Sequence, residues 1–262
     1  MSEPQIRFDD GAAYERMMGV WSRLAGDIFL DWLAPRSGLR WIDVGCGNGA
    51  FTELLVERCA PAEVQGIDPS EGQLAFARTR PAARLAQFRQ GDAMALPFAD
   101  NSFDAAAMAL VIFFVPEPAA GVAEMARVVC PGGPVASYAW DIEGGGFPHE
   151  PLLAEMRAMG LPPIRPPSFA ASRMENLRTL WTGAGLDRIE TREITVHRTF
   201  EDFDDFWGAA LLGASIKATV ARMTSEQLER LKESVCAQLS ADHDKPLTLS
   251  ARANAIHGRV PD

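Results

Sequence analysis

Apolar residues in this chain gather in short continuous runs, separated by longer stretches in which they recur with helical spacing. The nearly continuous runs cover residues 41–44, 103–115 and 135–140, and the shorter, mixed segments 62–67 and 86–89 also predict strands. Continuous runs of this kind are typical of strands buried on both faces of a parallel sheet. Two later runs, 187–197 and 247–257, predict two further strands. Strands that alternate with helices predict an α/β fold.

An amphipathic helix is predicted from Tyr14 onward. Its apolar face consists of Tyr14, Met17, Met18, Trp21, Leu24, Ala25, Ile28 and Trp32. This stripe predicts either a helix that packs on the domain or one whose first half caps a ligand, and the large patch of Tyr14, Met18 and Trp21 favours the cap. Further helices are predicted at 119–129, 152–159, 176–184 and 225–239, and around the aromatic residues of 200–207. Residues 1–10 are expected to be loose.

Three glycines, Gly45, Gly47 and Gly49, separate the first strand from the helix that follows it. Glycine permits unusual backbone angles and lets a ligand come close to the backbone, and a helix N-terminus offers unpaired N–H groups. The dinucleotide fingerprint is Gly-x-Gly-x-x-Gly, whereas here the third glycine comes one residue early. Asp43 precedes the loop, where a carboxylate would gain nothing from a pyrophosphate but would attract a cationic or amine-bearing ligand.

Asp68 ends the second predicted strand, 25 positions after Asp43. An acid about 20 residues beyond a glycine loop suits hydrogen bonds to ribose hydroxyls. The alternative is a structural role at a helix N-terminus, since Asp68-Pro69-Ser70-Glu71 also opens a helix. Both roles are compatible if Ser70 caps the helix. Farther along, Gly91-Asp92-Ala93 follows the third strand, and on its own would be a solvated turn.

These segments together resemble the class I S-adenosylmethionine-dependent methyltransferases, and among them the methyltransferase type 11 group that includes ubiquinone- and menaquinone-biosynthesis enzymes. Three motifs support the resemblance, namely Asp43-Val44-Gly45-Cys46-Gly47-Asn48-Gly49, Gly66-Ile67-Asp68-Pro69-Ser70, and Gly91-Asp92-Ala93 with Leu96-Pro97-Phe98 and Ser102-Phe103-Asp104. The resemblance is close over residues 40–140 and looser elsewhere. It implies a Rossmann-like sheet of seven strands, mostly parallel with the last antiparallel, and helices on both faces. It implies S-adenosyl-L-methionine as the cofactor.

The resemblance also implies which residues contact the cofactor. The amino acid end would lie on Asp43, Gly45, Cys46, Gly47, Asn48 and Gly49; the ribose on Asp68, with Pro69 flanking the adenine and Ser70 in the same cofactor-binding motif; the adenine on Gly91, Asp92 and Ala93; the methionine part on Ala109 and Leu110; and Tyr14 and Trp21 would cap it. Met18, Phe113, Phe114, Trp140 and Trp207 are the expected substrate pocket, although Phe113 and Phe114 are equally compatible with plain core.

Methyl transfer from a sulfonium needs mainly alignment and exclusion of water, and a base only if the acceptor must lose a proton. No catalytic residue is assigned, and His149 and Tyr14 are weak candidates. His149 lies in the glycine- and proline-rich stretch 141–172, which leaves the fifth strand where open α/β sheets bind ligands. A lone histidine in such a polar loop is more often simply exposed.

The net charge of −10 disfavours a nucleic-acid partner, because that affinity rests on basic residues. The small basic run of Arg78, Arg80, Arg84 and Arg89 is expected to be a solvated face. Four widely spaced cysteines favour neither a disulfide framework nor a metal site, and fit a reducing cytoplasm. No signal peptide or membrane span is expected, and the partner is a small-molecule acceptor, with a homodimer as the candidate assembly.

The predicted organisation is one methyltransferase domain over 1–262. It consists of a cap helix at 11–34, a Rossmann-like core at 38–198 and 246–258, and a helical insertion at 199–245 over the active-site face. Two other functions stay open. A nicotinamide-dependent oxidoreductase would share the strand, glycine loop and helix, although Asp43 and the early third glycine disfavour it. A noncatalytic cofactor-binding module is the second, because binding motifs do not prove turnover.

Overall fold

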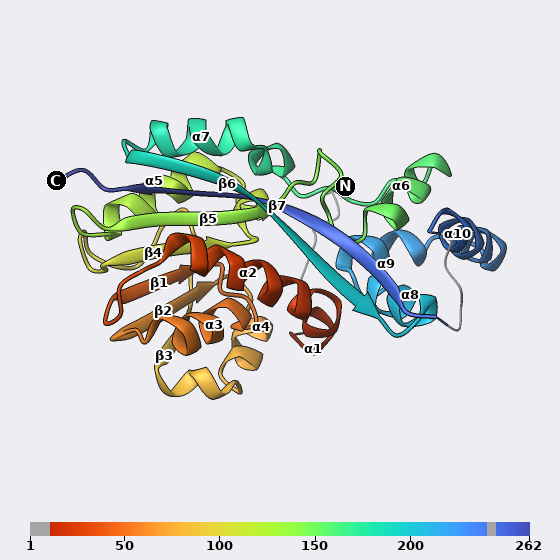
Figure 1. Cartoon of the computed structure of the whole chain (residues 1–262), viewed down its shortest axis with the longest axis horizontal. Coiled ribbons are helices and arrows are strands. Elements are labelled where there is room, and N and C mark those ends of the chain that lie inside the picture. The colour runs from red at the N-terminus through yellow and green to blue at the C-terminus, as the bar shows by residue number, and fades with distance from the viewer. Residues whose placement is uncertain (1–10, 240–244) are drawn as a thin grey trace.

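A computed structural model describes residues 11–239 and 245–262 of the chain. Its centre is a seven-stranded sheet in the order β3-β2-β1-β4-β5-β7-β6, with β7 antiparallel to both of its neighbours and the other paired strands parallel. The strands are β1 (Arg40–Val44), β2 (Glu63–Asp68), β3 (Ala86–Gln90), β4 (Ala105–Ala109), β5 (Pro134–Trp140), β6 (Asp187–Phe200) and β7 (Leu247–Arg259). The predicted mostly parallel, Rossmann-like α/β sheet is therefore confirmed (Figure 1).

The central strands form because they are apolar on both faces. Every residue of β1 after Arg40 is buried, and β5 is buried from Val135 to Trp140. Helices cover both sides of the sheet (Figure 1). They include α3 (Ala50–Cys59), α4 (Glu71–Ala77), α5 (Pro118–Val128) and α7 (Met174–Gly183), whereas α6 (Glu150–Ala158) lies beyond the sheet and packs beside α10 (Ser225–Gln238). No helix in the described ranges is long and apolar enough to cross a bilayer.

The N-terminal helix is present from Gly11, the first described residue, onward. It runs through α1 (Gly11–Tyr14), a π-helical segment η1 (Glu15–Gly19) and α2 (Val20–Leu33). Short π segments inside α-helices are often found at functional sites. The predicted loose stretch 1–10 lies outside the described residues, as does 240–244 of the predicted insertion.

Strands β6 and β7 are much longer than the strands beside them. Trp140, the last residue of β5, pairs with Ala253, whereas β6 and β7 stay paired as far as Phe200 and Leu247. They therefore continue as a two-stranded ribbon past the carboxyl end of β5 (Figure 1). The segment between them holds α8 (Phe203–Ala210), α9 (Ala214–Val220) and α10 (Ser225–Gln238). The ribbon thus places these helices beyond the sheet edge at which parallel α/β proteins bind ligands.

The fourth strand is shorter than the predicted run 103–115. It ends at Ala109, because Leu110 adopts a left-handed backbone with φ of 62° and donates its N–H to the carbonyl oxygen of Tyr138 at 2.8 Å. A short 3-10 helix, η3 (Ile112–Phe114), follows. The run is apolar because it is buried, and burial alone does not distinguish a strand from a turn.

Candidate functional site

The glycine loop between β1 and α3 needs glycine at each of its three positions. Gly45, Gly47 and Gly49 have φ angles of 75°, 51° and 80°, which side chains rarely adopt. A Cβ on Gly45 would come within 2.4 Å of Val111, so β1 can end against the segment after β4 only without a side chain there. A Cβ on Gly47 would meet only the side-chain oxygen of Gln73, at 3.9 Å. The space above Gly47 therefore has room for a ligand.

Asp68, the last residue of β2, holds this loop in shape. One carboxylate oxygen accepts from the N–H of Gly47 at 2.9 Å and the other from the N–H of Ser70, also at 2.9 Å. Ser70 itself caps α4 by accepting from the N–H of Gln73 at 3.3 Å. The sequence predicted that Ser70 could cap the helix while Asp68 binds a ligand. In the structure Ser70 is the cap, so Asp68 is not needed in that role. Burial raises the pKa of Asp68, and the two backbone hydrogen bonds oppose the rise.

Asp43 lies beneath the loop and is completely buried. One carboxylate oxygen accepts from the hydroxyl of Thr52 at 2.6 Å, and the other has no hydrogen-bond partner among the described residues. Burial raises its pKa to about 7, the Thr52 hydrogen bond lowers it, and the nearby charge of Asp68 raises it further. A buried carboxylate without a cation nearby is costly, so this position favours a positively charged ligand group close to the loop.

Asp92 lies in the turn after β3 and is exposed. Its side chain accepts from the N–H of Met94 at 2.9 Å, and the N–H of the preceding Gly91 donates to the carbonyl of Asp68 at 3.1 Å. Because β1, β2 and β3 are neighbours, Asp43, Asp68 and Asp92 stand at the carboxyl ends of three adjacent strands. They differ in exposure, from a fully buried Asp43 to a solvated Asp92, so they offer unequal contacts to a ligand.

Gln73 is a further polar side chain at this loop, and the sequence patterns did not single it out. It is only 2% exposed, and neither its amide oxygen nor its amide nitrogen has a hydrogen-bond partner among the described residues. Buried polar groups are normally paired, so an unpaired amide beside Gly47 fits a ligand that supplies the partner. The available signal was a polar residue within the buried face of α4, next to Leu74.

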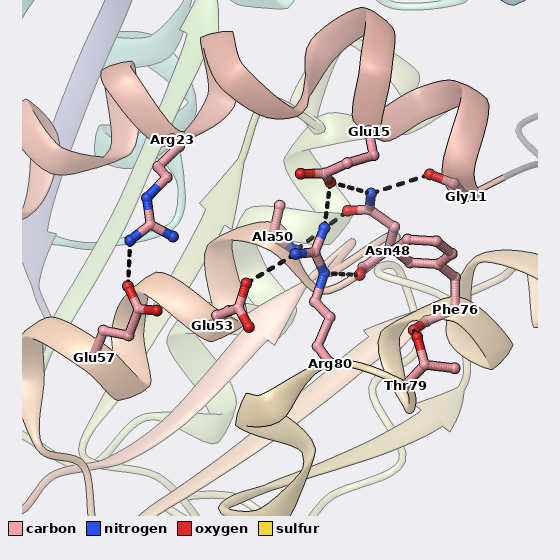
Figure 2. Close-up of polar contacts among 10 residues, drawn as sticks. All are labelled: Gly11, Glu15, Arg23, Asn48, Ala50, Glu53, Glu57, Phe76, Thr79 and Arg80. Atoms are coloured by element: carbon pink, nitrogen blue, oxygen red, sulfur yellow. Dashed lines mark hydrogen bonds and ion pairs between the residues drawn. The ribbon is translucent and has the colours of Figure 1, made fainter.

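The N-terminal helix is fastened onto the glycine loop. The side-chain nitrogen of Asn48 donates to Glu15 at 2.9 Å and to the carbonyl of Gly11 at 3.4 Å. Arg80 donates to the carbonyl of Asn48 at 2.7 Å and forms ion pairs with Glu15 and with Glu53, the latter at 2.8 Å (Figure 2). The Arg80 side chain is only 12% exposed, so the prediction of a solvated basic run is wrong for this residue. Its acidic partners come from distant segments, which no local pattern reveals.

A cavity of about 380 Å³ opens at the carboxyl ends of β4 and β5. Aromatic and aliphatic side chains dominate its wall, and they include Tyr14, Met17, Met18, Leu110, Phe113, Phe114, Trp140, Phe147, Leu153, Phe169 and Ile216. Five of these residues, namely Tyr14, Met18, Phe113, Phe114 and Trp140, are among those that the sequence suggested for the cap or the pocket. The cavity adjoins the glycine loop, because Val111, next to Leu110, lies against Gly45.

The segment that contains the glycine loop matches a known protein family. Residues 42–137, from β1 through β5, match a family described as a methyltransferase domain. This segment of the chain is therefore similar to a methyltransferase domain. A ubiquinone/menaquinone biosynthesis C-methyltransferase, UbiE of Dinoroseobacter shibae, is 40% identical to it over 121 residues, which are 45% of this chain and 48% of that protein. The chain thus spans about half the length of the curated relatives it matches first.

Several solved structures share the fold of this chain over most of its length. Phosphoethanolamine N-methyltransferase 2 of Haemonchus contortus, solved with S-adenosyl-L-methionine, has a TM-score of 0.57 and 18% identity, over 95% of this chain and 56% of that one. The [4+2]-cyclase SpnF has a TM-score of 0.53 and 21% identity, over 92% and 81%. Because one of these proteins is named as a cyclase, the fold by itself does not fix the reaction.

Most of the cavity wall lies outside the matched methyltransferase domain. Within 42–137 the wall includes only Leu110, Phe113 and Phe114. The rest comes from the N-terminal helix, the stretch after β5 and the start of α9. The predicted contribution of 141–172 to a ligand site is consistent with its position in this wall, and most of the cavity is built from segments that the family match does not cover.

His149 lies in this cavity wall and is fully buried, so the expectation of an exposed loop histidine is wrong. Its ring stands 5.6 Å from that of Phe147 and 6.1 Å from that of Phe206 on α8. Burial lowers its pKa to about 3, and the charge of Arg198 acts in the same direction, so the ring is neutral. Phe206, on a helix far along the sequence, contributes to this burial.

Two tryptophans do not occupy the predicted positions. Trp21, expected to cap the cofactor, has no exposed surface and packs its ring 6.5 Å from Trp140 and 6.3 Å from Phe200. Trp207, expected in the substrate pocket, stacks on Phe203 at 6.0 Å and is absent from the described cavity wall. Both lie on the apolar faces of their helices, which here turn toward the core.

Tyr14 does line the cavity, but it is poorly suited to act as a base. Burial raises its pKa to about 12, the nearby Ser22 hydroxyl opposes the rise, and the charges of Asp68 and Glu15 add to it. The hydroxyl therefore keeps its proton near neutral pH. The thiol of Cys46 is also held protonated, because burial and the charges of Asp43 and Asp68 raise its pKa.

Proposed function

We propose that this chain transfers a methyl group from S-adenosyl-L-methionine to a small-molecule acceptor. The observation that supports it most is the left-handed glycine loop with Asp68 bonded to Gly47 and the unpartnered amide of Gln73 beside it. This polar site adjoins an apolar cavity of about 380 Å³, within the range of small-molecule sites, which is roughly 300–1,000 Å³. One site has the chemistry for a cofactor and the other for an acceptor.

The residues present fit the cofactor in charge and in space. S-adenosyl-L-methionine supplies an electrophilic methyl group on a sulfonium sulfur, next to an amino acid end, a ribose and an adenine. Gly47 leaves room for close approach, and Asp43 supplies negative potential beneath the loop. Asp68 lies beside the loop, where it can accept hydrogen bonds from ribose hydroxyls. Asp92 lies at the end of the neighbouring strand, where it can accept a hydrogen bond from the adenine amino group.

The chain's own contribution to the reaction is alignment and exclusion of water. The N-terminal helix closes one side of the cavity through Tyr14 and Met18, and η3 closes another through Phe113 and Phe114. Holding two reactants in line removes much of the entropic part of a bimolecular barrier. His149 is neutral in this wall, so one of its ring nitrogens can accept a hydrogen bond from an acceptor group that comes to it, whereas burial disfavours its protonated form.

Calorimetry tests the cofactor. S-adenosyl-L-methionine should bind and NAD should not, and the reverse result would favour the nicotinamide-dependent alternative. Radiolabelled S-adenosyl-L-methionine incubated with quinols, phenols and amines tests turnover. Retained cofactor binding without product from any acceptor would favour a noncatalytic module. Homodimeric assembly, cytoplasmic location and the absence of a nucleic-acid partner stay predictions from the sequence, and sedimentation checks the first of them.

A further inference from the structure

The cavity is apolar inside and positively charged at its rim. Three arginines, Arg157, Arg165 and Arg173, and two acids, Glu143 and Glu150, belong to its wall. The acids are already paired, because Glu150 forms an ion pair with Arg157 and Glu143 with Arg173.

Arg165 is the third of these arginines, and it differs from the other two. No carboxylate of the described residues pairs with it, and its guanidinium lies 4.9 Å from the ring centre of Phe169. It is exposed at the rim, while the chain as a whole has a net charge of −10. A local excess of positive charge on an acidic protein indicates a ligand with an anionic group at this rim.

His149 is the polar side chain deep in the wall, and it is buried and neutral, whereas Arg165 is exposed and charged. Both ring nitrogens of His149 are buried and without a hydrogen-bond partner in the described part of the chain. A neutral imidazole has one donor nitrogen and one acceptor nitrogen. A hydroxyl satisfies either of them, whereas a charged group would lose its hydration at so buried a position. The wall around His149 therefore favours a neutral hydroxyl on the ligand.

The part of the cavity between His149 and Arg165 is suited to an aromatic ring. Phe113, Phe114, Trp140 and Phe147 line the cavity, and Met17 and Met18 add polarisable sulfur atoms. Aromatic rings pack edge-to-face or offset against such neighbours, and methionine adapts its shape to them. A volume of about 380 Å³ is near the small end of known ligand sites, roughly 300–1,000 Å³, which suits a compact ligand.

We propose that the acceptor is a hydroxylated aromatic acid, with its hydroxyl at His149, its ring among the aromatic side chains and its carboxylate at Arg165. This inference rests on the proposed function, because it names the acceptor class of that same site. A cationic amine is a poorer fit, since Glu143 and Glu150 are already paired with arginines. The family match does not supply this assignment, because His149 and Arg165 both lie outside residues 42–137.

Three matched probes test the proposal on the full chain without cofactor: 4-hydroxycinnamate, cinnamate, which lacks the hydroxyl, and 4-hydroxycinnamyl alcohol, which lacks the carboxylate. Binding is measured by calorimetry, with quenching of tryptophan fluorescence as a second signal. The first probe should bind about tenfold more tightly than either analogue, a difference of about 1.4 kcal/mol. Failure of 4-hydroxycinnamate to bind, or equal binding of all three probes, overturns the proposal.

Two variants assign each preference to its residue. His149→Phe should abolish the preference over cinnamate only, and Arg165→Gln the preference over the alcohol only. Arg222→Gln, at an exposed arginine outside the cavity wall, should keep both preferences. His149→Leu, which also removes both polar ring atoms, serves as a second variant if the phenylalanine variant does not fold, as judged by its melting temperature. A preference that survives its own variant overturns the assignment.

The same preparations are titrated with S-adenosyl-L-methionine. Loss of probe selectivity with intact cofactor binding would reject the acceptor class and leave methyl transfer in place. Absent cofactor binding would instead reject the proposed function, whatever the probes do.

Discussion

The side-chain nitrogen of Asn48, in the glycine loop, donates a hydrogen bond to Glu15, in the N-terminal helix, across 2.9 Å (Figure 2). Arg80 joins the same cluster through ion pairs with Glu15 and Glu53. The helix held in this way also presents Tyr14 and Met18 to the cavity. The contacts therefore link the loop proposed for the cofactor to the segment that closes the acceptor cavity.

Arg80→Gln should loosen the N-terminal helix. Removing one partner of a buried ion pair leaves the others unpaired, which costs about 3–5 kcal/mol in fully buried cases, and the 41% exposure of the Glu15 side chain reduces that cost here. We expect faster amide hydrogen exchange over residues 11–19 and a faster off-rate of S-adenosyl-L-methionine in stopped-flow experiments. Both effects follow from the same lost contacts.

Arg23→Gln is the matched control, because Arg23 also joins the N-terminal helix to α3, through Glu57 (Figure 2). That pair is 50% and 44% exposed, and exposed pairs contribute only about 0–1 kcal/mol. This variant should leave exchange and off-rate nearly unchanged. Equal effects of the two substitutions would show that Arg80 has no special role in holding the helix.

Gln73→Leu should change stability and cofactor binding in opposite directions. The buried amide has no partner in the described structure, so replacing it by an apolar group of similar size should raise the melting temperature of the ligand-free protein. The same change removes the groups that would bond to the cofactor and should weaken its binding by about 1–3 kcal/mol. Differential scanning calorimetry and titration calorimetry measure the two effects. Unchanged cofactor affinity would contradict a binding role for Gln73.

The sheet and its glycine loop were predictable because their signals are local. Strands buried on both faces, such as β1 and β5, are nearly continuous apolar runs, and three closely spaced glycines after such a strand predict a tight turn that a ligand can approach closely. The end of β4 was not predictable in this way. Leu110 breaks the strand with a left-handed backbone although its side chain is as apolar as those before it.

The candidate site was predicted less completely, because much of it forms through tertiary contacts. Arg80 is paired with acids on two helices, and His149 has Phe206 of α8, which follows β6, among its ring neighbours. Trp21 lies on the same apolar stripe as Met18, and nothing in the spacing says which of the two reaches the cavity. Only the assembled fold distinguishes a helix face that binds a ligand from one that packs in the core.

Ala34→Gly should stabilise the protein. Ala34 ends α2 in a left-handed conformation with φ of 43°, and its N–H bonds to the carbonyl of Leu30. That conformation costs a non-glycine residue about 1–2 kcal/mol, whereas glycine adopts it freely at a smaller entropic cost. We expect a gain of about 0.5–1 kcal/mol in the free energy of unfolding by urea. Ala126→Gly, inside α5, should instead lose about 1 kcal/mol, and a gain there would contradict the backbone argument.

The pKa of Asp43 predicts a dependence of stability on pH. Its value in the folded protein, about 7, lies above the ordinary 3.8, so the folded state keeps a proton that the unfolded state releases between these values. Stability from this group is therefore fully present below pH 3.8 and is lost as the pH rises to about 7. Asp43→Asn cannot ionise and should flatten this decline in urea titrations. Asp68, whose pKa is also raised, would leave a residual slope.

Cofactor binding should depend on the same group with the opposite sign. The titratable groups that act electrostatically with Asp43 are Asp68, Cys46 and Tyr138, and burial keeps the thiol and the phenol protonated. An ammonium or sulfonium ligand gains most when Asp43 is ionised, so the affinity for S-adenosyl-L-methionine should rise with pH up to about 7. Asp43→Asn should bind more weakly and with a flatter pH profile, while S-adenosyl-L-homocysteine, which lacks the sulfonium charge, should show a smaller pH effect in the natural sequence. An affinity that falls with pH through this interval, or the same profile in the variant, would mean that the cationic groups of the cofactor lie away from Asp43.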